Sequence, residues 1–170
     1  AVDEAVMPWL TSASVACGFH AGDATSMRLT VGLARRHGVA VGAHPAFAAR
    51  EGFGRREQAT TAREVEDLVT YQIGALAAIA AVEGVRLQHV KAHGALYNMA
   101  ARDGSLAAAI ARATAGVDPS LILFGLSGSA LIAAGIRAGL RTASEFFADR
   151  GYRPDGTLVS RAERGSVIDD

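Results

Sequence analysis

Apolar runs and helical patterns alternate along this chain from one end to the other. Five short apolar runs predict β-strands, at residues 13–19, 39–43, 86–91, 121–124 and 141–147. Between them, apolar positions that recur every three to four residues predict helices over residues 23–37, 61–83, 96–102, 105–115 and 129–138, and a short helix over 2–11 precedes the first strand. Residues 150–170 are expected to form loops, with a possible short strand at Leu158-Val159.

The repeated order of strand and helix requires parallel strands joined by right-handed crossovers. An open doubly wound sheet and a closed (β/α) barrel both satisfy this order. The polar residues favour the barrel, because almost every strand ends in a candidate functional group, whereas an open sheet gathers such groups at one switch point. We therefore expect an α/β fold, a TIM-like (β/α) barrel, formed by residues 1–170 as a single domain.

Composition excludes some classes of partner and changes the fold prediction little. Half of the 170 residues are hydrophobic, and 17 basic residues balance 17 acidic ones. This balance gives no indication of nucleic acid or of an acidic membrane surface as a partner. The single cysteine, Cys17, cannot form an internal disulfide, so we expect a buried structural thiol and a reducing, cytoplasmic compartment. We expect no apolar run long enough to span a bilayer and therefore no membrane association.

Three apolar runs lead directly into a histidine that is followed by glycine or proline within two residues. These histidines are His20, His44 and His93, and in a parallel fold they lie at the carboxyl ends of neighbouring strands, where ligands bind. Each could be a general acid or base or a metal ligand, and the alternative is a structural histidine bonded to the backbone. His89, inside the third predicted strand, is expected to be a packed core residue.

Lys91 is the only lysine in a chain that otherwise uses arginine for every basic position. It ends an apolar strand two residues before His93. Lysine is a compact point charge that loses its proton when it is desolvated, which arginine does not. Lys91 could therefore neutralise an oxyanion or phosphate, or act as a base or nucleophile. The alternative is a cation on a solvated edge without a functional role.

One acidic residue lies inside the fifth predicted strand and another follows it. Glu145 and Asp149 are candidate acid/base or metal-binding groups, with an internal arginine–carboxylate pair as the alternative. Polar residues at other strand ends and helix starts are candidates for binding substrate or phosphate: Asp23, Arg55, Asn98 and Arg150. Capping of the following helix would explain Asp23 equally well, and helix polarity would explain Asn98.

Several strings of this sequence, taken together and in order, resemble the LamB/YcsF family. They are T-S-A-x-V-A-C-G-F-H-A-G-D at 11–23, V-G-A-H-P at 41–45, G-F-G-R-R at 52–56, Y-Q-I-G-A-L at 71–76, Q-H-V-K-x-H-G-A-L-Y-N at 88–98, E-x-F-A-D-R-x-Y at 145–152 and P-D-G-T-L-V-x-R at 154–161. The resemblance covers essentially the whole chain.

The chain departs from the family pattern in three ways. Ala92 stands where members usually have the proline of K-P-H-G. Residues 46–49 read Ala-Phe-Ala-Ala, so the aspartate that members usually carry after His44-Pro45 is absent. The family begins with a strand bearing a D-x-N-x-D-x-G-E motif, and we expect this strand and a C-terminal segment to be missing here.

The resemblance implies an incomplete TIM-like barrel, with about seven strands in the family, related to polysaccharide deacetylases and glycoside hydrolases. It implies ATP-dependent opening of the lactam 5-oxo-L-proline to L-glutamate in a 5-oxoprolinase complex with partner subunits B and C. ATP would be the cofactor, with or without Mg²⁺, and no structural metal is expected. Lys91 would meet phosphate or oxyanion, His20, His44 and His93 would supply base and acid, and Glu145 or Asp149 would orient them.

Two alternatives stay open at this point. A metal-dependent amide or deacetylase-type hydrolase would use His20, His44 and His93 as ligands of Zn²⁺ or a similar ion. A non-catalytic subunit would only support its partners. The sequence leaves open the assignment of acid and base, the site of ATP, and whether the protein forms a homo-oligomer.

Overall fold

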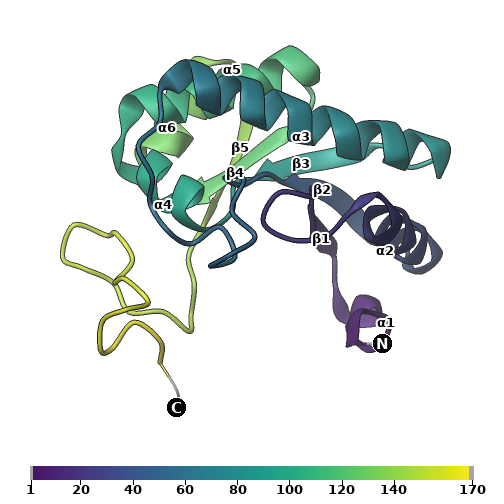
Figure 1. The fold of residues 1–170 in the computed structure, drawn as a ribbon, viewed down its shortest axis with the longest axis horizontal. Coiled ribbons are helices and arrows are strands. Elements are labelled where there is room, and N and C mark those ends of the chain that lie inside the picture. The colour runs from purple at the N-terminus through teal and green to yellow at the C-terminus, as the bar shows by residue number, and fades with distance from the viewer. Residues whose placement is uncertain (1, 169–170) are drawn as a thin grey trace.

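Five parallel strands form one sheet in the order in which they occur along the chain, β1-β2-β3-β4-β5, in the computed structural model, which describes residues 2–168 (Figure 1). The strands are β1 (Ser12–Ala16), β2 (Ala40–His44), β3 (Leu87–Lys91), β4 (Ile122–Leu126) and β5 (Arg141–Glu145). A doubly wound sheet reverses its strand order at a switch point, and this sheet does not. The sequential order confirms the prediction of an α/β fold of the incomplete TIM-like barrel type.

The helices follow the strands as predicted. They are α1 (Val2–Val6) with the 3₁₀ turn η1 (Met7–Trp9), α2 (Ala24–His37), α3 (Ala62–Val82), α4 (Gly94–Arg102), α5 (Gly104–Val117) and α6 (Ala130–Arg137). Figure 1 shows α3, α5 and α6 side by side along one face of the sheet, as each crossover returns the chain to the same side.

Some predicted boundaries were wrong. The first helix does not reach residue 11: it is α-helical only to Val6, because Pro8 lacks the N–H that the next helical hydrogen bond needs. The fifth strand ends at Glu145 rather than at residue 147. The predicted short strand at Leu158-Val159 is a single bridge between Leu158 and Tyr152. Positions 169 and 170 of the predicted C-terminal loop lie outside the described residues.

Contrary to our expectation, helix α3 is long and apolar enough to span a bilayer by length and composition alone. In the fold, however, one face of α3 belongs to the core. Val65, Val69, Ile73 and Leu76 are completely buried on that face, which packs against α5 and the sheet. We interpret α3 as the central core helix of a globular domain.

The centre of the sheet has a tight contact between β2 and β3. Gly42 lies opposite His89, whose imidazole covers the glycine so closely that a Cβ atom at position 42 would overlap the ring. His89 is buried, as expected of a core residue, and its Nε2 lies 3.0 Å from the Ser14 hydroxyl on β1. One histidine therefore connects the three strands whose ends carry the site.

Candidate functional site

The functional candidates meet at the carboxyl ends of β1, β2 and β3. His44 is the last residue of β2 and Lys91 the last residue of β3. His93 is the N-cap residue of α4, and His20 lies in the loop between β1 and α2. The structure therefore confirms that the three histidines and the lysine lie at neighbouring strand ends.

The three histidines form one cluster. The rings of His20 and His93 stack with their centroids 3.9 Å apart and an angle of 9° between their planes. His44 stands edge-on to both, with centroids 5.6 Å from His20 and 4.8 Å from His93. His20 is buried, whereas His44 and His93 are partly buried and line the adjoining cavity.

Backbone carbonyls hold two of these rings. The Nδ1 of His44 lies 2.6 Å from the carbonyl oxygen of Lys91, and the Nε2 of His93 lies 2.9 Å from that of Phe53. The other nitrogens of the two rings, His44 Nε2 and His93 Nδ1, lie 3.0 Å from each other. The Nδ1 of His20 is buried without a hydrogen-bond partner among the described residues.

The environment keeps the cluster uncharged. The pKa of His20 is lowered to about 4 and that of His44 to about 3, first by burial and then by repulsion from His93. The pKa of His93 is also lowered, first by burial, although its hydrogen bond to the Phe53 carbonyl opposes the shift. Near neutral pH each ring is therefore a neutral imidazole that can accept a proton or bind a metal ion.

The loop after β2 folds over the cluster by way of an unusual backbone turn. Phe53 has a φ of +54°, the only positive φ at a non-glycine among the described residues, and its carbonyl is the one that His93 contacts. Gly94 also has a positive φ, and a Cβ atom there would lie 2.5 Å from the carbonyl oxygen of Gly54. The turn and the start of α4 thus contact each other through their backbones, and this contact fixes the position of His93.

A buried glutamine in α3 holds the start of the same loop. The Gln72 side chain is completely buried; its amide oxygen accepts from the backbone N–H of Ala46 at 2.9 Å, and its amide nitrogen donates to the Ala46 carbonyl at 2.8 Å. The sequence analysis assigned no role to Gln72. Its function is to fix the chain two residues after His44.

We expect Gln72→Leu to lower the free energy of unfolding by about 2–4 kcal/mol, because it leaves the buried N–H and carbonyl of Ala46 without partners. Urea denaturation followed by circular dichroism measures this change. Thr70→Ala, an exposed hydroxyl two residues earlier, is the matched control and should change stability by less than about 0.5 kcal/mol. Equal midpoints for Gln72→Leu and the unchanged chain would contradict this role.

Lys91 forms an ion pair that the sequence analysis did not predict. Its Nζ lies 2.7 Å from Glu145 Oε2 at the end of β5, and each side chain keeps about a fifth of its surface exposed. The ammonium group also lies 4.9 Å from the centre of the Phe147 ring. The alternative for Glu145 was an ion pair with an arginine, and its partner in the structure is Lys91.

The second oxygen of Glu145 and a nearby phenol are buried without partners. Glu145 Oε1 and the Tyr97 hydroxyl both lack a hydrogen-bond partner within 3.5 Å among the described residues. Burial, and the negative charge of Glu145 next to it, raise the pKa of Tyr97 above its ordinary value. The two groups thus interact with each other beside Lys91.

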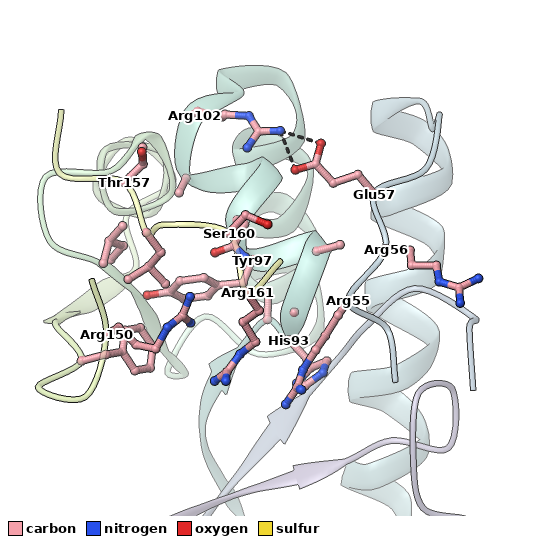
Figure 2. Close-up of a pocket in the computed structure, with 18 of the residues that line it drawn as sticks. Arg55, Arg56, Glu57, His93, Tyr97, Arg102, Arg150, Thr157, Ser160 and Arg161 are labelled. Atoms are coloured by element: carbon pink, nitrogen blue, oxygen red, sulfur yellow. Dashed lines mark hydrogen bonds and ion pairs between the residues drawn. The ribbon is translucent and has the colours of Figure 1, made fainter. Parts of the chain in front are cut away.

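A cavity of about 780 Å³ adjoins these residues and is lined by His44, Lys91, His93, Tyr97 and Asn98. Its other walls are rich in arginine. Arg55, Arg150 and Arg161 are among the lining residues, and Figure 2 labels them together with His93 and Tyr97. At the far end, Arg102 and Glu57 form an ion pair at 2.7 Å. A cavity with this excess of positive charge suits an anionic ligand.

The remaining predicted residues lie in different places. Arg55, Asn98 and Arg150 line the cavity, as a binding role requires. The Arg150 guanidinium also donates to the backbone carbonyls of Ser166 and Val159, so it holds the C-terminal loops in place. Asp23 is exposed and caps α2 by accepting from the backbone N–H of Ser26, which accounts for it without a ligand.

Asp149 lies apart from the cavity lining. It is exposed in the loop after β5, and its backbone carbonyl accepts from Ile168. Cys17 is buried as expected, and burial raises the pKa of its thiol to about 12, which makes it unreactive. The sequence analysis gave no role to Arg161 or Phe147. The string P-D-G-T-L-V-x-R, which ends at Arg161, was the available signal for the first of them.

Comparison with known proteins identifies the family of this chain. The model of the LamB/YcsF family matches residues 1–170. The chain belongs to the LamB/YcsF family. Two of its relatives are named as the A subunit of 5-oxoprolinase, one from Bordetella pertussis at 56% identity and one from Shouchella clausii at 58%. Each alignment covers 99% of this chain and 67% or 66% of the relative, so the chain spans about two thirds of their length.

One solved structure is similar to this chain in both fold and sequence. The crystal structure of a lactam utilization protein from Thermus thermophilus superposes with a TM-score of 0.92 at 48% identity, over 99% of this chain and 68% of that one. The LamB/YcsF resemblance inferred from the motifs is thereby confirmed, and so is the barrel-type fold.

Proposed function

We propose that this chain acts as the A subunit of a 5-oxoprolinase complex, which opens the lactam of 5-oxo-L-proline to L-glutamate at the expense of ATP, together with subunits B and C. The observation that carries the proposal is the juxtaposition of Lys91, Glu145 and the neutral histidine cluster at one arginine-rich cavity. The names of the relatives, which refer to 5-oxoprolinase and to lactam utilization, support it.

The chemistry of the substrate explains why such a site needs cations. 5-Oxoproline carries a carboxylate, and its lactam carbonyl is a poor electrophile. In the proposed reaction the lactam oxygen attacks the γ-phosphorus of ATP and displaces ADP. Arginines of the cavity and Lys91 would balance the charge of the carboxylate and of the transferred phosphoryl group.

Ring opening then needs a base and an acid. A water molecule adds to the activated carbonyl carbon and transfers a proton to a neutral histidine of the cluster. The C–N bond breaks as the ring nitrogen receives a proton, which gives an acyl phosphate of glutamate. A second water cleaves this acyl phosphate to glutamate and phosphate. Glu145 would hold Lys91 in position during these steps.

A reconstituted reaction tests the proposal. The chain is combined with the partner B and C subunits, and glutamate and ADP are measured with ATP and 5-oxoproline present. We expect equal amounts of glutamate and ADP, and no glutamate when the chain or ATP is left out. Glutamate formed without ATP would refute the ATP-coupled reaction. Because ATP is an intracellular nucleotide, we place the reaction in the cytoplasm.

A further inference from the structure

The hydrogen bonds of the histidine cluster leave two ring nitrogens facing each other with no proton between them. A backbone carbonyl only accepts, so His44 must carry its proton on Nδ1, facing Lys91, and His93 must carry its proton on Nε2, facing Phe53. In the neutral rings the remaining nitrogens, His44 Nε2 and His93 Nδ1, are then both lone pairs. These two lone pairs face each other at 3.0 Å.

Two lone pairs at this distance repel unless a cation lies between them. A proton would do so by making one ring an imidazolium. A metal ion resolves the conflict with both rings neutral. Two nitrogens that each bind one Zn²⁺ at about 2.0–2.1 Å lie about 3.3 Å apart in a tetrahedral site, close to the observed separation.

From this geometry we infer that His44 Nε2 and His93 Nδ1, completed by His20, form a binding site for a divalent transition-metal ion such as Zn²⁺. One ring nitrogen from each of the three residues lies within 4.8 Å of the other two. The inference goes beyond the proposed reaction, since binding of the ion does not depend on which substrate the protein uses. It favours the three-histidine alternative over our expectation that no metal is held.

The surroundings have the features that metal-binding histidines share. Such histidines almost always donate their second N–H to a backbone carbonyl or a carboxylate, which fixes the ring and its tautomer. His44 and His93 both do so. The carbonyl that holds His93 belongs to Phe53, whose positive φ is strained for an aromatic residue, and strain of this kind gathers at functional sites.

His20 supplies the third ligand of the proposed site and has a ring nitrogen without a hydrogen-bond partner among the described residues. Its residue is 3% exposed, and its buried Nδ1 has no partner among residues 2–168. Because its ring is parallel to that of His93, it must turn about its side-chain bonds to direct a lone pair at the shared ion. The fourth position would face the cavity that His44 and His93 line.

An ion in this place would occupy the facing nitrogens of His44 and His93 and one nitrogen of His20, so it would activate the attacking water at its open fourth position in place of a free histidine base. Glu145 neutralises Lys91 at 2.7 Å, so Lys91 has little effect on the affinity for the ion. Arg55, whose guanidinium carbon lies 5.1 Å from the centre of the Phe53 ring, is the positive charge that would limit this affinity. Imidazole ligands favour zinc, cobalt, nickel or copper over magnesium, so Mg²⁺ should not compete.

Metal binding to the metal-stripped chain, measured by calorimetric titration with Zn²⁺ in the absence of substrate, tests the inference. We expect one equivalent per chain, and affinity losses of roughly tenfold or more in His20→Ala and roughly a hundredfold or more in His44→Ala and His93→Ala. His37→Ala is the matched control, because His37 is exposed at the end of α2, and its affinity should equal that of the unchanged chain.

A second measurement does not depend on variants that could misfold. Co²⁺ added to the unchanged chain should give the strong visible absorption of a four-coordinate cobalt site, and Zn²⁺ should abolish it. Absence of stoichiometric uptake, or unchanged affinity in any of the three cluster variants, would overturn the assignment. Both readouts omit ATP and 5-oxoproline, so a failure here is distinct from a failure of the proposed reaction.

Discussion

Lys91→Met should reduce kcat/KM of the reconstituted, ATP-coupled reaction by about 10²–10³-fold, the usual cost of removing one group that stabilises developing negative charge. Methionine keeps the length of the side chain and removes the ammonium. Lys91→Arg should fail to restore activity, because a planar guanidinium cannot take the place of a compact ammonium between Glu145 and Phe147. Steady-state formation of glutamate and ADP measures both effects.

The ion pair makes this experiment ambiguous unless stability is separated from catalysis. Removal of Lys91 alone leaves the partly buried Glu145 carboxylate without its partner, which costs stability. The double variant Lys91→Met/Glu145→Gln removes both charges and should recover the stability of the fold without recovering turnover. Arg63→Ala, which breaks the exposed ion pair with Asp67, is the control for loss of a charge pair and should leave turnover unchanged.

If the double variant recovers full turnover, Lys91 has a structural role only. That outcome would favour a chain that supports its partner subunits without taking part in the reaction. Loss of turnover in both variants, with normal unfolding of the double variant, would show that turnover needs the charge pair for more than the stability of the fold.

Gly42→Ala should be among the most destabilising single substitutions in the molecule, with a loss of about 3 kcal/mol or more in the free energy of unfolding. The new methyl group would overlap the His89 imidazole. The ring cannot move away, because it is buried and contacts the Ser14 hydroxyl. Its centroid also lies 4.8 Å from that of the Phe124 ring. Urea or thermal unfolding measures the loss.

A control substitution and a second-site substitution test whether overlap with the His89 ring causes the loss of stability. Gly74→Ala lies on α3 with open space around it, so it should be neutral or stabilise the chain by up to about 1 kcal/mol. Removing the ring should relieve the overlap, so the double variant Gly42→Ala/His89→Ala should be more stable than Gly42→Ala alone. A double variant that is less stable than both single variants would show that the overlap is not the cause.

Much of the fold could be predicted from the chain because the sequence repeats one local unit. Each strand is an apolar run and each helix has one apolar face, so five strands and their helices are visible without any tertiary information. The N-terminal helix was extended too far, because the periodicity of Val2, Val6 and Leu10 outweighed Pro8 in the prediction. Local backbone chemistry decided that boundary.

The site was predictable where it depends on strand ends and not where it depends on loops. His44, Lys91 and His93 follow from the rule that parallel strands end on one side. The carbonyl of Phe53, the amide of Gln72 and the guanidinium of Arg161 reach the same place through turns and helix faces far away in sequence. No periodicity encodes those contacts, and only the folded chain shows them.

The solitary lysine has a practical consequence for spectroscopy. Because Lys91 is the only lysine, isotope labelling confined to lysine gives one side-chain ammonium signal, and that signal comes from the ion pair with Glu145. The resonance would report on the cavity without any substitution or attached probe. Titration with nucleotide, lactam or metal ion would then show, from one atom, which of them reaches the strand ends.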